Sequence, residues 1–276
     1  MNTKVYIILL LIFIFFNATN AQNNYEFLQL SGENVSTQSI TYAIKQDIVG
    51  NLWIASEEGV LKHNSNYYKV YNTYNGLPET INNRATEIFI DTKNNIWVGF
   101  ENGFCFYNKD LDKFDLIESK GKINPSLITS INEDAKGIIW IGGFNGLWNY
   151  NPVSKKINRV LSTISVEGFQ ILDNEILIGT TKGLFSLNIN SKDVSQIDLA
   201  SDSEKISFIN KVKNKIFVGT KNGKIYDLDH TNKKAKIKNI NREITNPITD
   251  IIFSNDSFFI ATDGEGIYKT DSNFKV

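Results

Sequence analysis

The sequence predicts an all-β fold built from six repeats of one small antiparallel sheet, and three observations lead to this prediction. A bulky apolar residue recurs at intervals of about 40 residues, each copy precedes a turn that ends in glycine, and each period has room for four short strands. Radial stacking buries sheet faces that one sheet cannot bury alone, so we expect a β-propeller. The bulky residues are Trp53, Trp97, Trp140, Leu177, Phe217 and Phe259, and the turn glycines are Gly59, Gly103, Gly146, Gly183, Gly223 and Gly266.

Each repeat is expected to contain an inner, a central, a third and an outer strand, in that order. The clearest copy is residues 137–150, where the apolar run through Ile141 breaks at Gly142 and resumes at Leu147. This pattern is typical of a strand, a tight turn and a second strand. The last repeat has at most a short piece of outer strand at 273–276. We place the six repeats near residues 39–74, 84–118, 127–161, 164–199, 205–240 and 247–276.

The joint between the inner and central strands also recurs. In the first three repeats it opens with Asp47, Asp91 or Asp134. An aspartate at this position can open a turn by accepting hydrogen bonds from nearby backbone N–H groups. In the later repeats the joint shortens to a two-residue hairpin signal. These shorter joints are Asp173-Asn174, Lys213-Asn214 and Asn255-Asp256.

Residues 1–21 are predicted to be a secretory signal peptide. Lys4 supplies the positive charge, Val5–Phe16 is apolar but short for a membrane span, and Ala21 is the expected cleavage point. The protein is therefore expected in the periplasm or secreted, and anchored to the membrane only if the signal stays uncleaved. No cysteine follows directly, which excludes a lipoprotein anchor. Residues 22–276 then form the propeller.

Tyr25–Leu30 indicates one isolated strand ahead of the first repeat. Propellers commonly close by lending an N-terminal strand to the last blade, and an unpaired edge strand is an aggregation hazard. We therefore expect this strand to complete the sixth blade. Two alternatives stay open at this point: six repeats close into a ring with this strand, or the chain is a fragment of a larger propeller with a seventh blade.

Composition and charge exclude several classes of function. The 276 residues carry 29 basic and 30 acidic side chains, a net charge of −1, which argues against a nucleic-acid partner. One cysteine, Cys105, excludes an intrachain disulfide and a thiolate zinc cluster. The two histidines, His63 and His230, lie far apart in sequence, so a histidine-built metal site is not expected. We predict no cofactor.

With the repeats aligned, the pattern Asp-x-x-Gly-x-Leu-Trp-Ile-Gly-Thr-x-x-Gly-Leu-x-x-Tyr emerges, best at 134–150, 91–107 and 47–63. This pattern closely resembles the two-component-regulator propeller repeat, and residues 75–83 look like that family's loop between blades. The resemblance implies the periplasmic sensor region of a hybrid histidine kinase. Repeats four to six depart from it because they lack the tryptophan. Since no kinase module is seen, we expect either a truncated sensor or a stand-alone propeller.

Candidate ligand-binding residues lie where the repeats deviate from one another. After the glycine or alanine of the central strand, the last three repeats have threonine, whereas the first three have Ser56, Phe100 and Gly143. Aromatic, acidic, amide and arginine side chains on one face would suit a sugar or another polar ligand; a solvated turn face is the alternative. The repeated tryptophans and glycines are assigned to packing and turns. The candidates are Glu57, Arg84, Phe100, Glu101, Phe144 and Asn145.

Three functions are weighed on this basis. The first is a non-catalytic ligand sensor, with a second propeller or a membrane kinase as partner. The second is a stand-alone propeller that binds a glycan or a protein. The third is a propeller lyase or hydrolase, which we do not favour because the sequence has no nucleophile signature, P-loop or GxGxxG motif. We therefore predict that the chain is not an enzyme.

Overall fold

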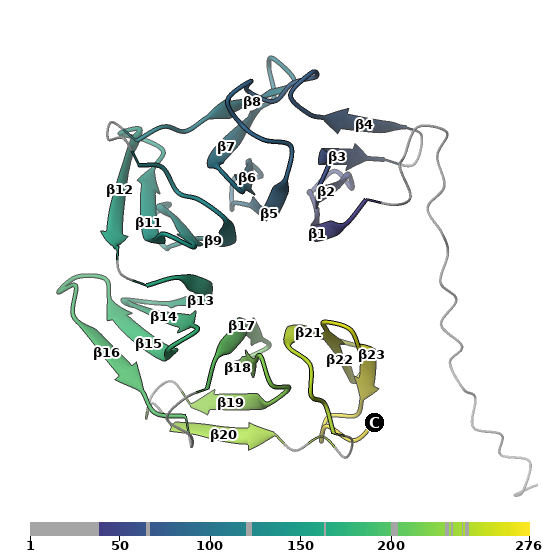
Figure 1. Cartoon of the computed structure of the whole chain (residues 1–276), viewed down its shortest axis with the longest axis vertical. Coiled ribbons are helices and arrows are strands. Elements are labelled where there is room, and N and C mark those ends of the chain that lie inside the picture. Colours follow the sequence, from purple (N-terminus) through teal and green to yellow (C-terminus); the bar gives the residue numbers. More distant parts are fainter. Residues whose placement is uncertain are drawn as a thin grey trace, which may run out of the picture. The chain divides into compact units, whose positions relative to one another are not determined.

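The computed structural model describes residues 39–276 apart from 65–66, 120–122, 163, 200–203, 230–231, 233, 239 and 241–242. The described residues form strands and turns, with no helix among them and hence none that could span a membrane. Figure 1 shows six sheets that follow one another in chain order around a ring. The predicted six-repeat β-propeller is therefore confirmed. The predicted signal peptide and the Tyr25–Leu30 strand lie outside the described residues.

The first three sheets, which we call blades 1 to 3, each contain four antiparallel strands in sequence order. The first strand of each is the inner one, and these inner strands contact one another from blade to blade. Blade 1 comprises β1 (Thr41–Gln46), β2 (Leu52–Ser56), β3 (Gly59–His63) and β4 (Tyr68–Tyr71); blade 2, β5 (Ala85–Ile90), β6 (Ile96–Phe100), β7 (Gly103–Asn108) and β8 (Lys113–Leu116); blade 3, β9 (Ile128–Glu133), β10 (Ile139–Gly143), β11 (Gly146–Asn151) and β12 (Lys156–Leu161).

Blades 4 and 5 repeat this order, whereas blade 6 has only three strands among the described residues. This agrees with the prediction that the last repeat has at most a short piece of outer strand. Blade 4 comprises β13 (Val166–Leu172), β14 (Glu175–Thr180), β15 (Gly183–Asn188) and β16 (Val194–Ile197); blade 5, β17 (Ile206–Val212), β18 (Lys215–Thr220), β19 (Ile225–Asp229) and β20 (Lys234–Lys238); blade 6, β21 (Ile248–Ser254), β22 (Ser257–Thr262) and β23 (Gly266–Thr270).

The repeated tryptophans lie between blades. Trp53 is buried with residues of blade 2, Trp97 with residues of blade 3, and Trp140 with residues of blade 4. Each ring thus joins its own sheet to the next, and the burial of large aromatic surface is a major stabilising contribution. The core of the molecule consists of these interfaces between neighbouring sheets.

An aspartate fixes the orientation of each of these tryptophans. In blade 1, Asp47 Oδ1 accepts hydrogen bonds from the backbone N–H groups of Val49 at 3.1 Å and Asn51 at 2.9 Å. Its Oδ2 accepts the indole N–H of Trp53 at 3.0 Å. Burial alone would raise the pKa of Asp47, but these hydrogen bonds outweigh it and hold the pKa below its usual value. Asp91 and Asp134 accept the indole N–H groups of Trp97 and Trp140 in the same way. These aspartates therefore hold the buried tryptophans in place in addition to their predicted role in the turn.

Candidate functional site

The structure brings three of the six candidate residues together on one face. Glu57 lies in the turn after β2, Glu101 lies in the turn after β6, and Arg84 directly precedes β5. The turns between central and third strands share this face with the connections between blades, so residues distant in sequence meet here. Arg84 lies between the two acids, which belong to different blades.

Arg84 makes several interactions at the centre of this group. Its Nε lies 3.4 Å from Glu57 Oε1, and its Nη1 lies 3.9 Å from Glu101 Oε1. The Nε also donates a hydrogen bond to the Tyr42 hydroxyl at 3.0 Å, and the guanidinium carbon lies 5.2 Å from the centre of the Tyr42 ring. Tyr42 in turn donates its hydroxyl proton to Glu57. We call Tyr42, Glu57, Arg84 and Glu101 the Arg84 cluster.

Contacts within the cluster keep Arg84 charged and Tyr42 protonated. The hydrogen bond to Tyr42, together with Glu57 and Glu101, raises the pKa of Arg84. Burial and the hydrogen bond to Glu57 raise the pKa of Tyr42, so the phenol stays protonated and remains a donor. The side chains of Arg84, Glu57 and Glu101 are 37%, 39% and 45% exposed. A ligand can therefore reach all three.

Asn82 adds an unsatisfied acceptor beside the cluster. Its side-chain N–H donates to Glu101 Oε2 at 2.8 Å, and its backbone N–H donates to Asn102 Oδ1 at 2.9 Å. Its Oδ1 is buried and accepts no hydrogen bond from any of the described residues. Buried polar atoms are normally satisfied, so an ordered water is the expected donor to this oxygen. Sequence analysis missed both Asn82 and Tyr42, because neither stands at a position where the repeats deviate visibly.

The other three candidates have different surroundings. Phe100 is 0% exposed, so its ring is part of the core and does not face a ligand. Asn145 accepts the indole N–H of Trp148 at 3.1 Å and donates to the backbone oxygen of Asn124 at 2.7 Å, which ties the connection between blades 2 and 3 to its turn. Phe144 is 65% exposed. Among the described residues, no hydrogen bond or ring contact joins Phe144 to the Arg84 cluster.

The threonines of the later repeats have a structural role in their turns. Thr180 Oγ1 donates to the backbone oxygen of Gly183 at 2.9 Å, and Thr262 Oγ1 donates to that of Gly266 at 2.8 Å. Thr220 closes its own turn through Lys224 at 3.3 Å. Each hydroxyl closes its own turn, as the Ser56 hydroxyl does through the backbone oxygen of Gly59 at 3.1 Å in blade 1.

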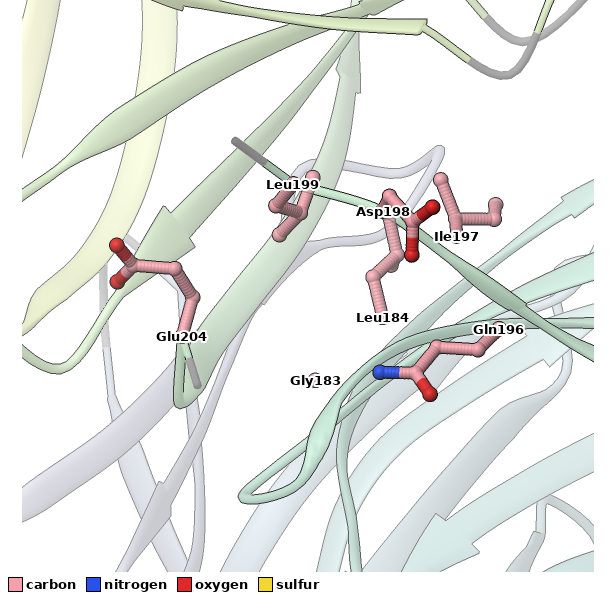
Figure 2. Close-up of a pocket in the computed structure, with 7 residues that line it drawn as sticks. All are labelled: Gly183, Leu184, Gln196, Ile197, Asp198, Leu199 and Glu204. Atoms are coloured by element: carbon pink, nitrogen blue, oxygen red, sulfur yellow. The ribbon is translucent and has the colours of Figure 1, made fainter. Parts of the chain in front are cut away.

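A small hollow lies on the same face between blades 4 and 5 (Figure 2). It has a volume of about 10 Å³, which is room for roughly one water molecule. Figure 2 shows Gly183 and Gln196 on one side and Glu204 on the other. The Glu204 carboxylate is already paired with Lys224 and accepts the Tyr226 hydroxyl proton at 3.2 Å. This hollow is therefore too small to hold a ligand, and the carboxylate that lines it already has its partners.

No protein-family model matches the sequence, and no curated protein matches it. Solved structures do match. The extracellular domain of the hybrid two-component system BT3049 from B. thetaiotaomicron superposes with a TM-score of 0.70 at 21% identity, over 84% of this chain and 33% of that one. The extracellular domain of BT4673 from the same organism gives 0.71 at 19%, over 85% and 32%. The fold is that of their propellers.

A third similar structure is PorZ, a surface component of the type-IX secretion system of Porphyromonas gingivalis, with a TM-score of 0.65 at 13% identity, over 84% of this chain and 38% of that one. The chain thus spans about a third of the length of the solved sensor domains. At these identities the likeness shows the fold, which is the fold that the repeat pattern implied. Among the described residues, no group of three or more His, Cys, Asp or Glu side chains is placed to hold a metal ion.

Proposed function

We propose that this chain is a non-catalytic, extracytoplasmic propeller that senses a polar ligand at the Arg84 cluster. The observation that carries the proposal is the half-exposed arginine that lies between carboxylates of two blades. Carboxylates accept hydrogen bonds from hydroxyl groups, the guanidinium donates them, and the Tyr42 ring offers an apolar face. A saccharide needs this combination of acceptors, donors and an aromatic surface.

Two further observations support this reading. The predicted signal peptide and the extracellular location of the similar solved domains both favour a place outside the cytoplasm. Asn82 donates to Glu101 Oε2 at 2.8 Å and so orients this carboxylate on the exposed face. A protein-binding role, without a small ligand, is the second candidate, because the charged side chains of the cluster are 37–45% exposed.

The position of the cluster suggests how binding is transmitted. Glu57 belongs to blade 1, whereas Arg84 and Glu101 belong to blade 2. A ligand that competes for Arg84 changes the contact between the two blades. In a longer sensor, this change would alter how two propellers pack together, and that packing would shift a membrane kinase between its states. The shift requires that the ligand bind one arrangement of the propellers better than the other.

Calorimetric titration with a panel of oligosaccharides tests the proposal. The double variant Glu57→Ala/Arg84→Ala should weaken binding at least about tenfold, because it removes charged hydrogen bonds to the ligand. A matched control is Glu167→Ala/Lys221→Ala, which removes an ion pair of 2.9 Å between blades 4 and 5. Equal affinities for the two double variants would remove the Arg84 cluster from consideration as the site.

A further inference from the structure

A pocket of about 530 Å³ lies between blades 2 and 3, and none of the functions considered so far uses it. Its walls include Asn95, Asn108 and Lys155, which lie at the strand ends opposite to the turn that carries Glu101. The pocket is therefore separate from the Arg84 cluster. Its volume is in the range of pockets that hold small ligands.

Three aromatic rings line this pocket: Trp97, Phe106 and Tyr150. The centres of the Trp97 and Phe106 rings are 4.8 Å apart, and those of Trp97 and Tyr150 are 5.7 Å apart at an angle of 63°. Phe106 is half-buried and is the most accessible of the three. The wall next to these rings carries the carboxylate of Asp115, and Glu118 adds a second one.

The position equivalent to this pocket one repeat earlier, between blades 1 and 2, is occupied by a lysine side chain. We call the pocket between blades 2 and 3 the open groove and the occupied position between blades 1 and 2 the filled groove. There Trp53 and Tyr107 form the same aromatic pair, 4.8 Å apart at an angle of 61°. The Nζ of Lys62 lies 5.0 Å from the centre of the Trp53 ring and 5.6 Å from that of Tyr107. The protein thus places its own ammonium group against the rings, which is a cation–π arrangement.

Strand register makes the two grooves comparable residue by residue. Trp53 is paired across the sheet with Lys62, and Trp97 is paired with Phe106. The groove between blades 2 and 3 therefore has a third ring where its neighbour has an ammonium group. One blade further on, Asn149 is paired with Trp140, but the Nζ of Lys192 from blade 4 lies 5.6 Å from the Trp140 ring, so an ammonium group again lies against the tryptophan.

The charged residues also differ between the filled groove and the open groove. In the filled groove, Lys69 pairs with Asp112, which accepts the hydroxyl proton of Tyr107. In the open groove, Asp115 stands in the register position of Lys69. Among the described residues, Tyr150 makes no hydrogen bond through its hydroxyl, and Asp115 forms no ion pair and accepts one hydrogen bond, from Asn108 at 2.8 Å.

We propose that this groove binds an organic ammonium cation supplied by a small ligand. The rings of Trp97, Phe106 and Tyr150 form an aromatic cage for the cation, and Asp115 supplies the opposite charge. Aromatic cages with a nearby carboxylate favour alkylated ammonium groups, because the rings attract the positive charge without requiring N–H donors. Lys155 also lines the pocket and would pair with an anionic or polar group elsewhere on the ligand.

Choline is the probe for this proposal, and 3,3-dimethylbutan-1-ol is its neutral control of the same shape. Titration is followed by the indole N–H signals of the four tryptophans in ¹H–¹⁵N NMR spectra, with Trp97 assigned from a Trp97→Phe variant. We expect choline to shift the Trp97 signal, while the neutral alcohol does not. The Trp53 signal serves as an internal reference, because Lys62 already occupies its groove.

Two variants test the roles of charge and space separately. Asp115→Asn should weaken choline binding about tenfold, as expected for loss of one charged partner. Phe106→Lys rebuilds the lysine of the neighbouring groove, and its own ammonium should abolish the response to choline while the other indole signals report an intact fold. The proposal is overturned if the Trp97 signal does not respond to choline, if the alcohol shifts it equally, or if Phe106→Lys still binds choline.

Discussion

Two turn glycines at equivalent positions differ in what surrounds them. Gly146 has a φ of +121°, and a Cβ added there would lie 1.9 Å from the backbone oxygen of Leu161. Gly266 has a φ of +80°, and nothing lies within 4 Å of its added Cβ. The first position combines an unfavourable backbone conformation with a clash against backbone, whereas the second has only the unfavourable conformation.

Gly146→Ala should therefore destabilise the protein by about 3 kcal/mol or more, and Gly266→Ala by about 1 kcal/mol. Urea unfolding followed by tryptophan fluorescence measures both losses under the same conditions. Similar losses for the two variants would show that backbone conformation alone, and not the approach of Leu161, requires glycine at 146.

Single residues also show what sequence reasoning could and could not predict in the site. Glu57, Arg84 and Glu101 stood out because they lie where the repeats differ, and the structure places them in one cluster. Phe100 stood out for the same reason, yet it is fully buried. A departure from the repeat shows that a position is unusual, but it does not show whether the side chain points outward or into the core.

At the scale of elements, Asp112 joins the strands of two blades. It lies in the turn between β7 and β8, pairs with Lys69 of β4, and accepts the hydroxyl protons of Tyr107 and, at 2.6 Å, of Tyr71. Burial would raise its pKa, but these three partners outweigh burial and lower the pKa from 3.8 to about 2. The folded protein thus binds this proton more weakly than the unfolded chain does.

It follows that the contribution of Asp112 to stability is present above pH 3.8 and is lost as the pH falls toward about 2. The side chain is 51% exposed, so solvent screening limits the contribution to about 1 kcal/mol. Urea unfolding between these pH values should show a smaller loss of stability for Asp112→Asn than for the unchanged protein. Asp110→Asn, in the same turn, should keep the full acid dependence.

The strands of each blade were predictable because their signals are local. Glycine ends a turn, aspartate opens one, and apolar runs between them mark strands. The grooves between blades were not predictable in the same way. Their contents depend on which side chain of one repeat meets which side chain of the next, as with Lys62 and Tyr107. Such pairs have no fixed spacing signal, so the pocket beside Phe106 appears only in the structure.

At the scale of the whole molecule, the ring brings charges from distant blades into one environment. Glu87 of β5 pairs in register with Gly99 and interacts with Lys45 of β1 and Asp250 of β21. Burial is the main cause that raises the pKa of Glu87 from 4.5 to about 7; Asp250 adds to the rise and Lys45 opposes it. Blades 1, 2 and 6 thus contribute to the protonation of one carboxyl group.

The raised pKa means that the folded protein holds this proton more tightly than the unfolded chain. The contribution of Glu87 to stability is therefore complete below pH 4.5 and is lost as the pH rises to about 7, a change on the order of 2 kcal/mol. Glu87→Gln keeps a neutral side chain of the same shape at every pH. The difference in unfolding free energy between this variant and the unchanged protein should therefore grow over that pH window, whereas Glu79→Gln at an exposed loop position should show no such trend. A difference that stays constant with pH would mean that Glu87 is ionised throughout, and hence that the inner strands leave it open to water.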